Sequence, residues 1–151
     1  MSEAFESVLA HVEFLARRFK RDNLRNVICV ILMELGIHTN HDGFDYLVTG
    51  ITLYLRNKPL VRQLGLYPAI ARQYREYVTD KQIERSIRNA IAAAWKNFDP
   101  VDWIRYFPPE SDGKIKKPCN TAFISRIARV LELWEGCCEE TMNETCKEDL
   151  V

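Results

Sequence analysis

The sequence lacks most of the features that mark a secreted protein or a membrane protein. No apolar run approaches the roughly 20 residues that a membrane-spanning helix needs. The N-terminus does not have the basic-then-apolar order of a secretion signal. The 5 cysteines are an odd number at irregular spacing, which is typical of a reducing compartment rather than of a disulfide framework. We therefore expect a cytoplasmic protein with no membrane partner.

Catalytic and metal-binding patterns are also scarce. There is no glycine-rich phosphate loop, no nucleophile elbow and no defensible Ser-His-Asp order. His38 and His41 stand beside Asp42 and Asp45, but His-x-x-His lacks the spacing of zinc enzymes and offers no third strong ligand. The adjacent cysteines at 137 and 138 lack the Cys-x-x-Cys spacing of metal and redox sites. We expect a protein that is not an enzyme and that uses no metal and no cofactor.

Charge is balanced in total but uneven along the chain. The 21 basic and 21 acidic residues cancel, which argues against a general polycation. Between residues 56 and 96, however, basic residues clearly outnumber acidic ones. They are Arg56, Lys58, Arg62, Arg72, Arg75, Lys81, Arg85, Arg88 and Lys96. Because local charge decides whether phosphate is attracted, this segment is the candidate surface for a nucleic acid.

What is present is helical periodicity within one domain-sized chain of 151 residues. The pattern predicts helices near 24–35, 42–57, 58–64 and 120–136, the last ended by Gly136. Asp99 and Pro100 begin another short helix, to which Val101, Ile104 and Phe107 give an apolar side. Gly50, inside a helix, indicates a close helix crossing. The fold class is all-α.

The most informative stretch runs from Tyr67 to Trp95. Pro68 suits the first turn of a helix whose apolar face continues through Tyr74 and Tyr77. After a very short turn, Thr79 and Gln82 have the spacing of a capping box. A second helix then carries an apolar side formed by Ile83, Ile87, Ala90, Ile91, Ala94 and Trp95. Two helices joined in this way form a helix-turn-helix pattern.

The opposite side of the second helix presents Gln82, Arg85 and Asn89 in one stripe, flanked by Lys81 and Arg88. Glutamine and asparagine can pair with adenine in the major groove, and arginine with guanine. Basic flanks neutralise phosphate. The alternative interpretation is a solvated polar face, because charged outer faces are usual on surface helices.

Five blocks in a fixed order resemble a known family. They are IxxELGI (31–37), GFDYL (43–47), LYPAIA (66–71), IERSIRNAIAAAW (83–95) and KPCNTAFI (117–124). Together they resemble the DNA-binding effector domain of the stage-zero sporulation response-regulator transcription factors, over about residues 27 to 133. The resemblance implies six to seven helices containing a helix-turn-helix, in a winged-helix-like effector topology without strands. It implies that residues 80–96 are the recognition helix.

The resemblance also implies roles and partners. Glu84, Arg85 and Arg88 coincide with the family's own residues and inherit base-edge or phosphate contacts. Gln82 stands where the family usually has arginine, Asn89 where it has histidine, and Lys81 replaces a small hydroxyl residue. These departures predict an altered target sequence. The implied partners are double-stranded DNA, a second copy of the chain on DNA, and RNA polymerase.

Three lysines of a polar loop, Lys114, Lys116 and Lys117, offer further contacts with the DNA backbone. The alternative is that the loop is simply solvated. The division of the chain that we expect is an amphipathic helix at 1–22, the DNA-binding domain at 23–136 and an acidic, flexible tail at 137–151.

The helix at 1–22 has two interpretations. Its apolar positions are Phe5, Val8, Leu9, Val12, Leu15, Ala16 and Phe19, and Ser2 is its expected N-cap. Such a stripe either packs on the domain or pairs two copies of the chain. Family members carry a phosphorylatable receiver domain, for which some twenty residues are too few. The pairing hypothesis therefore has the helix take over the receiver's role in bringing two domains together.

A function of another class is also compatible with the sequence. The chain could be an interaction module that no longer binds DNA and that antagonises related regulators by pairing with them. The zero net charge and the acidic tail favour this alternative, because a negative tail competes with phosphate for a basic face.

Overall fold

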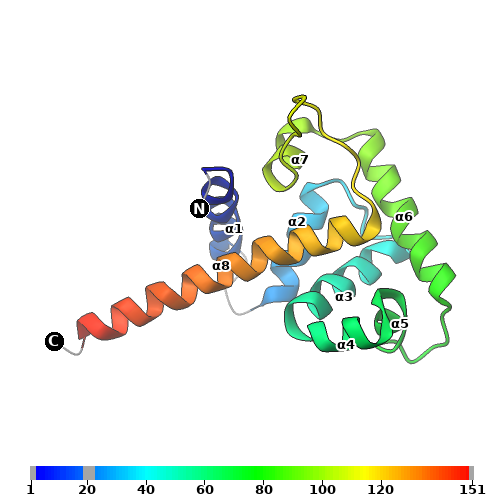
Figure 1. Cartoon of the computed structure of the whole chain (residues 1–151), viewed down its shortest axis with the longest axis horizontal. Helices are drawn as coiled ribbons and strands as arrows, with labels where there is room; N and C mark the ends of the chain where they lie inside the picture. The colour runs from blue at the N-terminus through cyan, green and yellow to red at the C-terminus, as the bar shows by residue number, and fades with distance from the viewer. Residues whose placement is uncertain (1–2, 19–22, 150–151) are drawn as a thin grey trace.

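The computed structural model describes residues 3–18 and 23–149, with the side chains of 6–18 and 23–139. Within these residues it forms eight helices and no strand (Figure 1), so the all-α expectation is confirmed. The helices are α1 (Glu3–Arg18), α2 (Leu24–Glu34), α3 (Asp42–Arg56), α4 (Lys58–Leu64), α5 (Leu66–Ala71), α6 (Asp80–Lys96), α7 (Pro100–Tyr106) and α8 (Asn120–Asp149). The expectations for Ser2, Phe5 and Phe19 fall outside the described side chains. None of these helices is both long and apolar enough to cross a membrane.

The helix α3 forms the centre of the fold and packs against α2, α4, α5, α6 and α8. Its side chains Phe44, Leu47, Val48 and Ile51 are almost completely buried. Burying apolar surface on a helix of this kind is the main favourable contribution to folding. The recognition-helix candidate α6 is thereby held by the central element of the core.

Aromatic side chains fix the C-terminal end of α6. The rings of Trp95 and Phe98 stack with centroids 4.3 Å apart, and Trp103 of α7 meets Trp95 edge-to-face. Trp103 is fully buried and donates its Nε1–H to the carbonyl oxygen of Leu35 at 3.1 Å. Because the buried indole of Trp103 also needs an acceptor for its N–H, it fits in only one orientation where α6 and α7 meet.

The predicted apolar side of α7 was wrong for Val101 and Ile104, whereas Phe107, just after the helix, packs against the core beside Trp103 and Phe123. Val101 and Ile104 are 65% and 42% exposed, whereas Trp103 and Tyr106 are completely buried. All four residues are apolar or aromatic, so periodicity alone did not distinguish the two faces. The larger rings remove more apolar surface from water when they are buried, and they occupy the core face.

The apolar side of α1 packs within the chain, where Val8, Val12 and Ala16 are fully buried. The helix contacts α8, α2 and α7. Trp134 of α8 donates its Nε1–H to Glu13 Oε2 at 2.8 Å, and His11 Nε2 lies 2.7 Å from Glu34 Oε1 of α2. These contacts support the interpretation of α1 as part of the domain.

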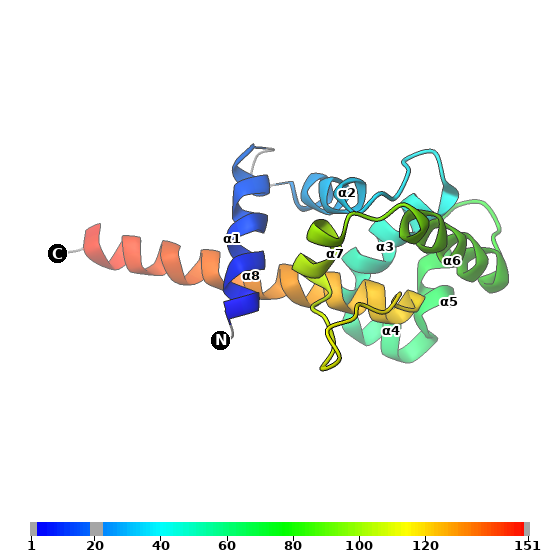
Figure 2. The same cartoon turned by 90° about the horizontal axis from the view of Figure 1, so that it is seen from above.

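The helix α8 is longer than the sequence indicates. It continues through Gly136, which we expected to end it, as far as Asp149. Gly136 does not have a positive φ, and a helical glycine costs only about 1 kcal/mol relative to alanine. Cys137 and Cys138 still pack on the core, and Cys138 Sγ lies 3.6 Å from Glu13 Oε2. Beyond α1 the helix projects away from the body (Figures 1 and 2).

Candidate nucleic-acid interface

The helix α6 begins as the sequence predicts. Thr79 is its N-cap, and the capping box with Gln82 is present in both directions. The buried side consists of Ile83, Ile87, Ala90, Ile91 and Ala94. Burial of this side leaves the predicted stripe of Gln82, Arg85 and Asn89 exposed, together with Lys81 and Arg88.

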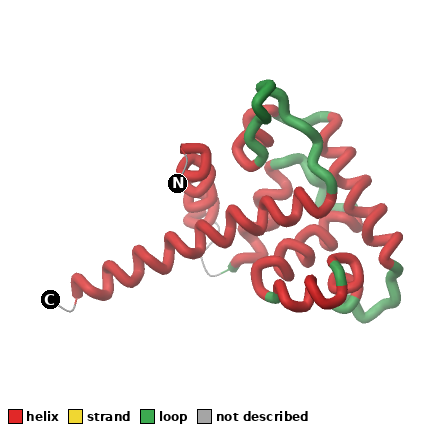
Figure 3. The backbone as a smooth tube through the Cα atoms, in the orientation of Figure 1, coloured by secondary structure: helices red, strands yellow, loops and turns green. Residues whose placement is uncertain are grey.

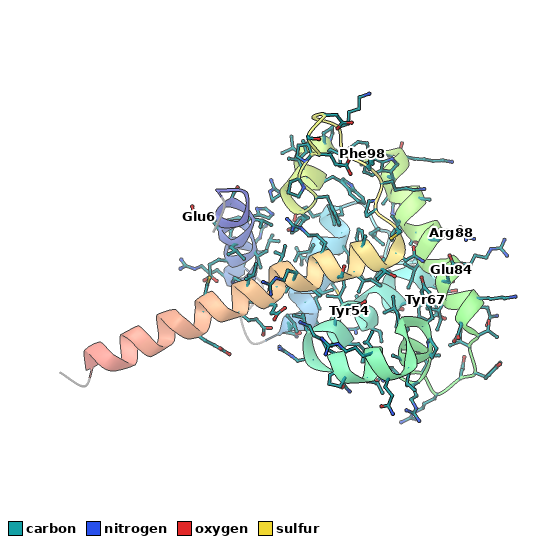
Figure 4. All side chains as sticks on the ribbon, in the orientation of Figure 1. Glu6, Tyr54, Tyr67, Glu84, Arg88 and Phe98 are labelled. Atoms are coloured by element: carbon teal, nitrogen blue, oxygen red, sulfur yellow. The ribbon has the colours of Figure 1, made fainter. Side chains whose placement is uncertain are left out.

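Two contacts seat α6 on its neighbours. Gly43 of α3 lies against the backbone of Ser86, where a side chain at position 43 would collide. Asn120, at the start of α8, is buried and donates its Nδ2–H to the carbonyl oxygen of Glu84 at 3.0 Å and to the Tyr67 hydroxyl at 3.1 Å. Figure 4 labels Tyr67, Glu84 and Arg88 close together on this side of the molecule. These two contacts, together with the buried apolar side, fix the position and rotation of α6 against α3 and α8.

The two arginines of the outer face differ in their partners. Arg88 donates to Glu84 Oε1 at 3.0 Å across one helical turn. Arg85 makes no ion pair within the described part of the chain and is exposed. An exposed ion pair contributes little to stability, so Arg88 can exchange Glu84 for a phosphate at small cost. Arg85 can contact a ligand without first giving up an ion pair.

The side chain of Gln82 is engaged by the N-cap. Its Oε1 accepts from the Thr79 backbone N–H at 2.9 Å and lies 3.1 Å from Thr79 Oγ1. The bidentate pairing with adenine that the sequence suggests needs this same oxygen as an acceptor. The capping role and the expected base-reading role of Gln82 therefore compete for one atom.

The connection between the two helices is longer than expected. The first helix, α5, ends at Ala71, and residues 72–79 form a loop (Figure 3) instead of continuing the helix to Tyr77. Tyr77 is 92% exposed, whereas the sequence places it on an apolar face. No glycine or proline lies between Ala71 and Val78 to signal the helix end. Tyr77 lines an open cleft of about 330 Å³ together with Gln82 and Arg85.

Sequence reasoning therefore missed Tyr77 as a surface residue of this site. Arg72 and Arg75, in the same loop, are also exposed and extend the basic surface beside Lys81. Their charge was visible in the sequence as part of the basic run from 56 to 96. Their position was not, because it depends on where α5 ends.

Of the three loop lysines, the structure brings Lys117 to α6. Lys117 lines a cleft of about 350 Å³ together with Glu84 and Arg88. Lys116 instead pairs with Glu110 of its own loop at 3.0 Å. Lys114 is exposed, and its backbone N–H bonds to Asp112. Only Lys117 lies beside the outer face of α6.

Neither α1 nor the projecting part of α8 covers the outer face of α6. The views of Figures 1 and 2 agree that α1 and the projecting part of α8 lie on the far side of the body from α6. The residues with metal-ligating side chains form no group of three or more anywhere in the described ranges. The rings of His38 and His41 are 6.0 Å apart beside the start of α3.

Comparison with protein families adds an independent finding. Residues 28–131 match the model of the family described as "Sporulation initiation factor Spo0A C terminal". The match contains α3 to α7 in full, most of α2 and the first part of α8. It therefore covers the helix-turn-helix and every residue of the candidate interface.

Proposed function

Since the chain belongs to the family of the sporulation initiation factor Spo0A C-terminal domain, we propose that it is a transcription regulator that reads the major groove of DNA with α6. One observation carries the proposal. The helix buries its apolar side and leaves Arg85 and Asn89 exposed on a face that no other segment of the described chain covers. A helix inserted in the groove needs such a face.

Each exposed residue has a distinct role in this proposal. Arg85 reads guanine through its guanidinium fork, and Asn89, one turn further on, reads adenine. Lys81, Lys117 and Arg88 contact phosphates on either side, with Glu84 holding Arg88 in the free protein. Lys114 and Lys116 reach the DNA backbone only if their loop moves toward the duplex, because neither lies against α6.

The target sequence is expected to be related to the family's usual promoter element but different from it. Gln82, Asn89 and Lys81 depart from the family's residues at three exposed positions. A selection of bound duplexes from a random pool would reveal the preferred sequence. Recovery of the unaltered family element with full preference would contradict this part of the proposal.

Pairing on DNA is proposed separately. If α1 joins two copies, it must use a surface other than its apolar side, because that side is buried against α8 and α2. Sedimentation of the intact chain and of a chain starting at residue 22 would decide. Identical monomers in both cases would end the idea that α1 pairs two domains. A contact with RNA polymerase is proposed from the family alone.

The central test is a mobility-shift assay with random duplex at low and at higher salt. Counterion release predicts that log K falls linearly with log salt concentration, with a slope of about −0.9 per phosphate contact. Absence of binding at low salt would instead favour the interaction-module alternative. In that case the acidic, projecting end of α8 would be the first surface to examine.

A further inference from the structure

Thr79 and Gln82 form a closed set of hydrogen bonds at the start of α6. The Thr79 backbone N–H donates to Gln82 Oε1 at 2.9 Å, and the Thr79 hydroxyl donates to the same oxygen at 3.1 Å. The Gln82 backbone N–H donates to Thr79 Oγ1 at 3.2 Å. The orientation of the carboxamide is determined, because the backbone N–H of Thr79 can only donate and must face an oxygen.

An amide oxygen accepts two hydrogen bonds, and an amide nitrogen donates two. Both acceptor positions of Gln82 Oε1 are therefore filled by Thr79. The two N–H groups of Nε2 have no partner within the described part of the chain, and the side chain is exposed beside Arg85. What Gln82 presents to a ligand is a pair of donors without an acceptor.

From this geometry we infer that Gln82 is a donor-only reader of the major groove and that Thr79 is the residue that positions it. The inference rests on the proposed function and names the base chemistry at one position of the site. Guanine offers N7 and O6 as acceptors, adenine offers N7, and thymine offers O4, whereas cytosine presents only its N4 amino donor. Gln82 therefore tolerates the three acceptor-bearing bases and rejects cytosine.

The usual bidentate pairing of glutamine with adenine is not available while the box is closed. It needs Oε1 to accept from the adenine N6 amino group. Releasing Oε1 would leave the Thr79 N–H at the helix start without a partner and would weaken the N-cap. A side chain already held in its bound conformation also loses less entropy on binding, which favours the closed arrangement.

The test is a selection from a random duplex pool with the full chain and five variants, one of them a control. The base pair that Gln82 reads is the one whose preference is flattened by Gln82→Ala. At that position we expect the wild-type chain to accept guanine, adenine and thymine, with a loss of roughly fivefold or more for cytosine. Thr79→Ala frees one acceptor position, so adenine becomes preferred by roughly fivefold or more. Thr79→Ser keeps the hydroxyl and keeps the wild-type profile.

The Gln82→Glu variant provides a second test, for which the opposite base preference is expected. A carboxylate preserves the capping box with one oxygen and accepts from cytosine with the other, so the preference inverts toward cytosine. The matched control is Asn23→Ala, which removes the N-cap of the distant α2, where Asn23 Oδ1 accepts from the Asn26 backbone N–H at 3.2 Å. This control leaves the base preference unchanged.

The outcomes separate the inference from the function it rests on. A wild-type chain that prefers adenine as strongly as Thr79→Ala does would overturn the donor-only reading while leaving DNA recognition by α6 in place. An unchanged base profile in Thr79→Ala would do the same. If no form of the chain binds DNA, the proposed function and the inference fail together.

Discussion

Gly43 of α3 and Ser86 of α6 are in backbone contact at the crossing of the two helices. A Cβ built at position 43 would collide with the carbonyl oxygen of Ser86 and would lie 2.8 Å from Ala90 Cβ. Both helices are rigid and packed in the core, so neither can move aside cheaply. The absence of a side chain at position 43 sets how deeply α6 sits and how far its outer face projects.

Gly43→Ala is therefore expected to destabilise the fold by about 1–3 kcal/mol, through overpacking against the backbone. Gly136→Ala is the matched control, because a Cβ at position 136 has open space around it. It is expected to stabilise the protein by about 0.5–1 kcal/mol, since alanine loses less backbone entropy in a helix. Denaturant unfolding of both variants measures the difference. Equal effects would contradict the crossing geometry.

Arg85→Ala is expected to weaken binding to the selected duplex by about 1–3 kcal/mol and to relax preference at one base pair. The folded state should be unaffected, because Arg85 is exposed and makes no ion pair among the described residues. Fluorescence anisotropy on matched and mismatched duplexes measures both effects. Arg17→Ala, on α1 at the far side of the body, serves as the control of equal charge change. A uniform loss on every sequence would reassign Arg85 to phosphate contact.

Tyr77→Ala is expected to weaken DNA binding while changing the free energy of unfolding by less than about 0.5 kcal/mol. The reason is that Tyr77 is 92% exposed, so truncation removes little buried surface, yet it lies beside Gln82 and Arg85. Phe14→Ala removes an aromatic ring that is 58% exposed on α1 and should leave binding unchanged. A large stability loss in Tyr77→Ala would show that the loop 72–79 packs differently.

The stability of the protein is expected to fall in alkaline solution. Burial raises the pKa of Tyr106 well above its usual value near 10, and the nearby Glu34 carboxylate, which accepts its hydroxyl at 3.2 Å, raises the pKa further. Above pH 10 the unfolded chain loses this proton while the folded chain keeps it. The folded chain then binds one more proton than the unfolded chain. The free energy of unfolding therefore declines as the pH rises, by up to about 1.4 kcal/mol per pH unit.

Unfolding measured between pH 8 and pH 11 checks this expectation. Below pH 10, Tyr106 keeps its proton in both the folded and the unfolded chain. Its stabilising contribution is then fully present, and it does not make the free energy of unfolding depend on pH. Tyr106→Phe removes the titrating group and should flatten the alkaline slope, apart from the share of Cys29, Tyr46 and Tyr74, whose pKa values are also raised by burial. A slope that is unchanged in Tyr106→Phe would contradict the assignment.

The sequence predicted correctly the features that depend only on residues close together in the chain. The capping box of Thr79 and Gln82 depends on two residues three positions apart, and the apolar side of α6 depends on helical period alone. Both predictions are confirmed. The end of α5, by contrast, carries no local signal, and the short turn and the apolar role of Tyr77 that followed from it were wrong.

The sequence by itself determined that the chain is all-α, that α6 has one apolar and one polar side, and which family the chain resembles. Tertiary structure decided the rest. The core contains Trp103 rather than Ile104, and Lys117 rather than Lys116 lies beside α6. The close approach that the sequence indicated at Gly50 is confirmed, since a Cβ there would lie 3.0 Å from Ile124 of α8, but the tighter backbone crossing at Gly43 appears only in the tertiary structure. Periodicity says which side of a helix is apolar. Which neighbour that side meets, and at what distance, depends on residues far apart in the chain.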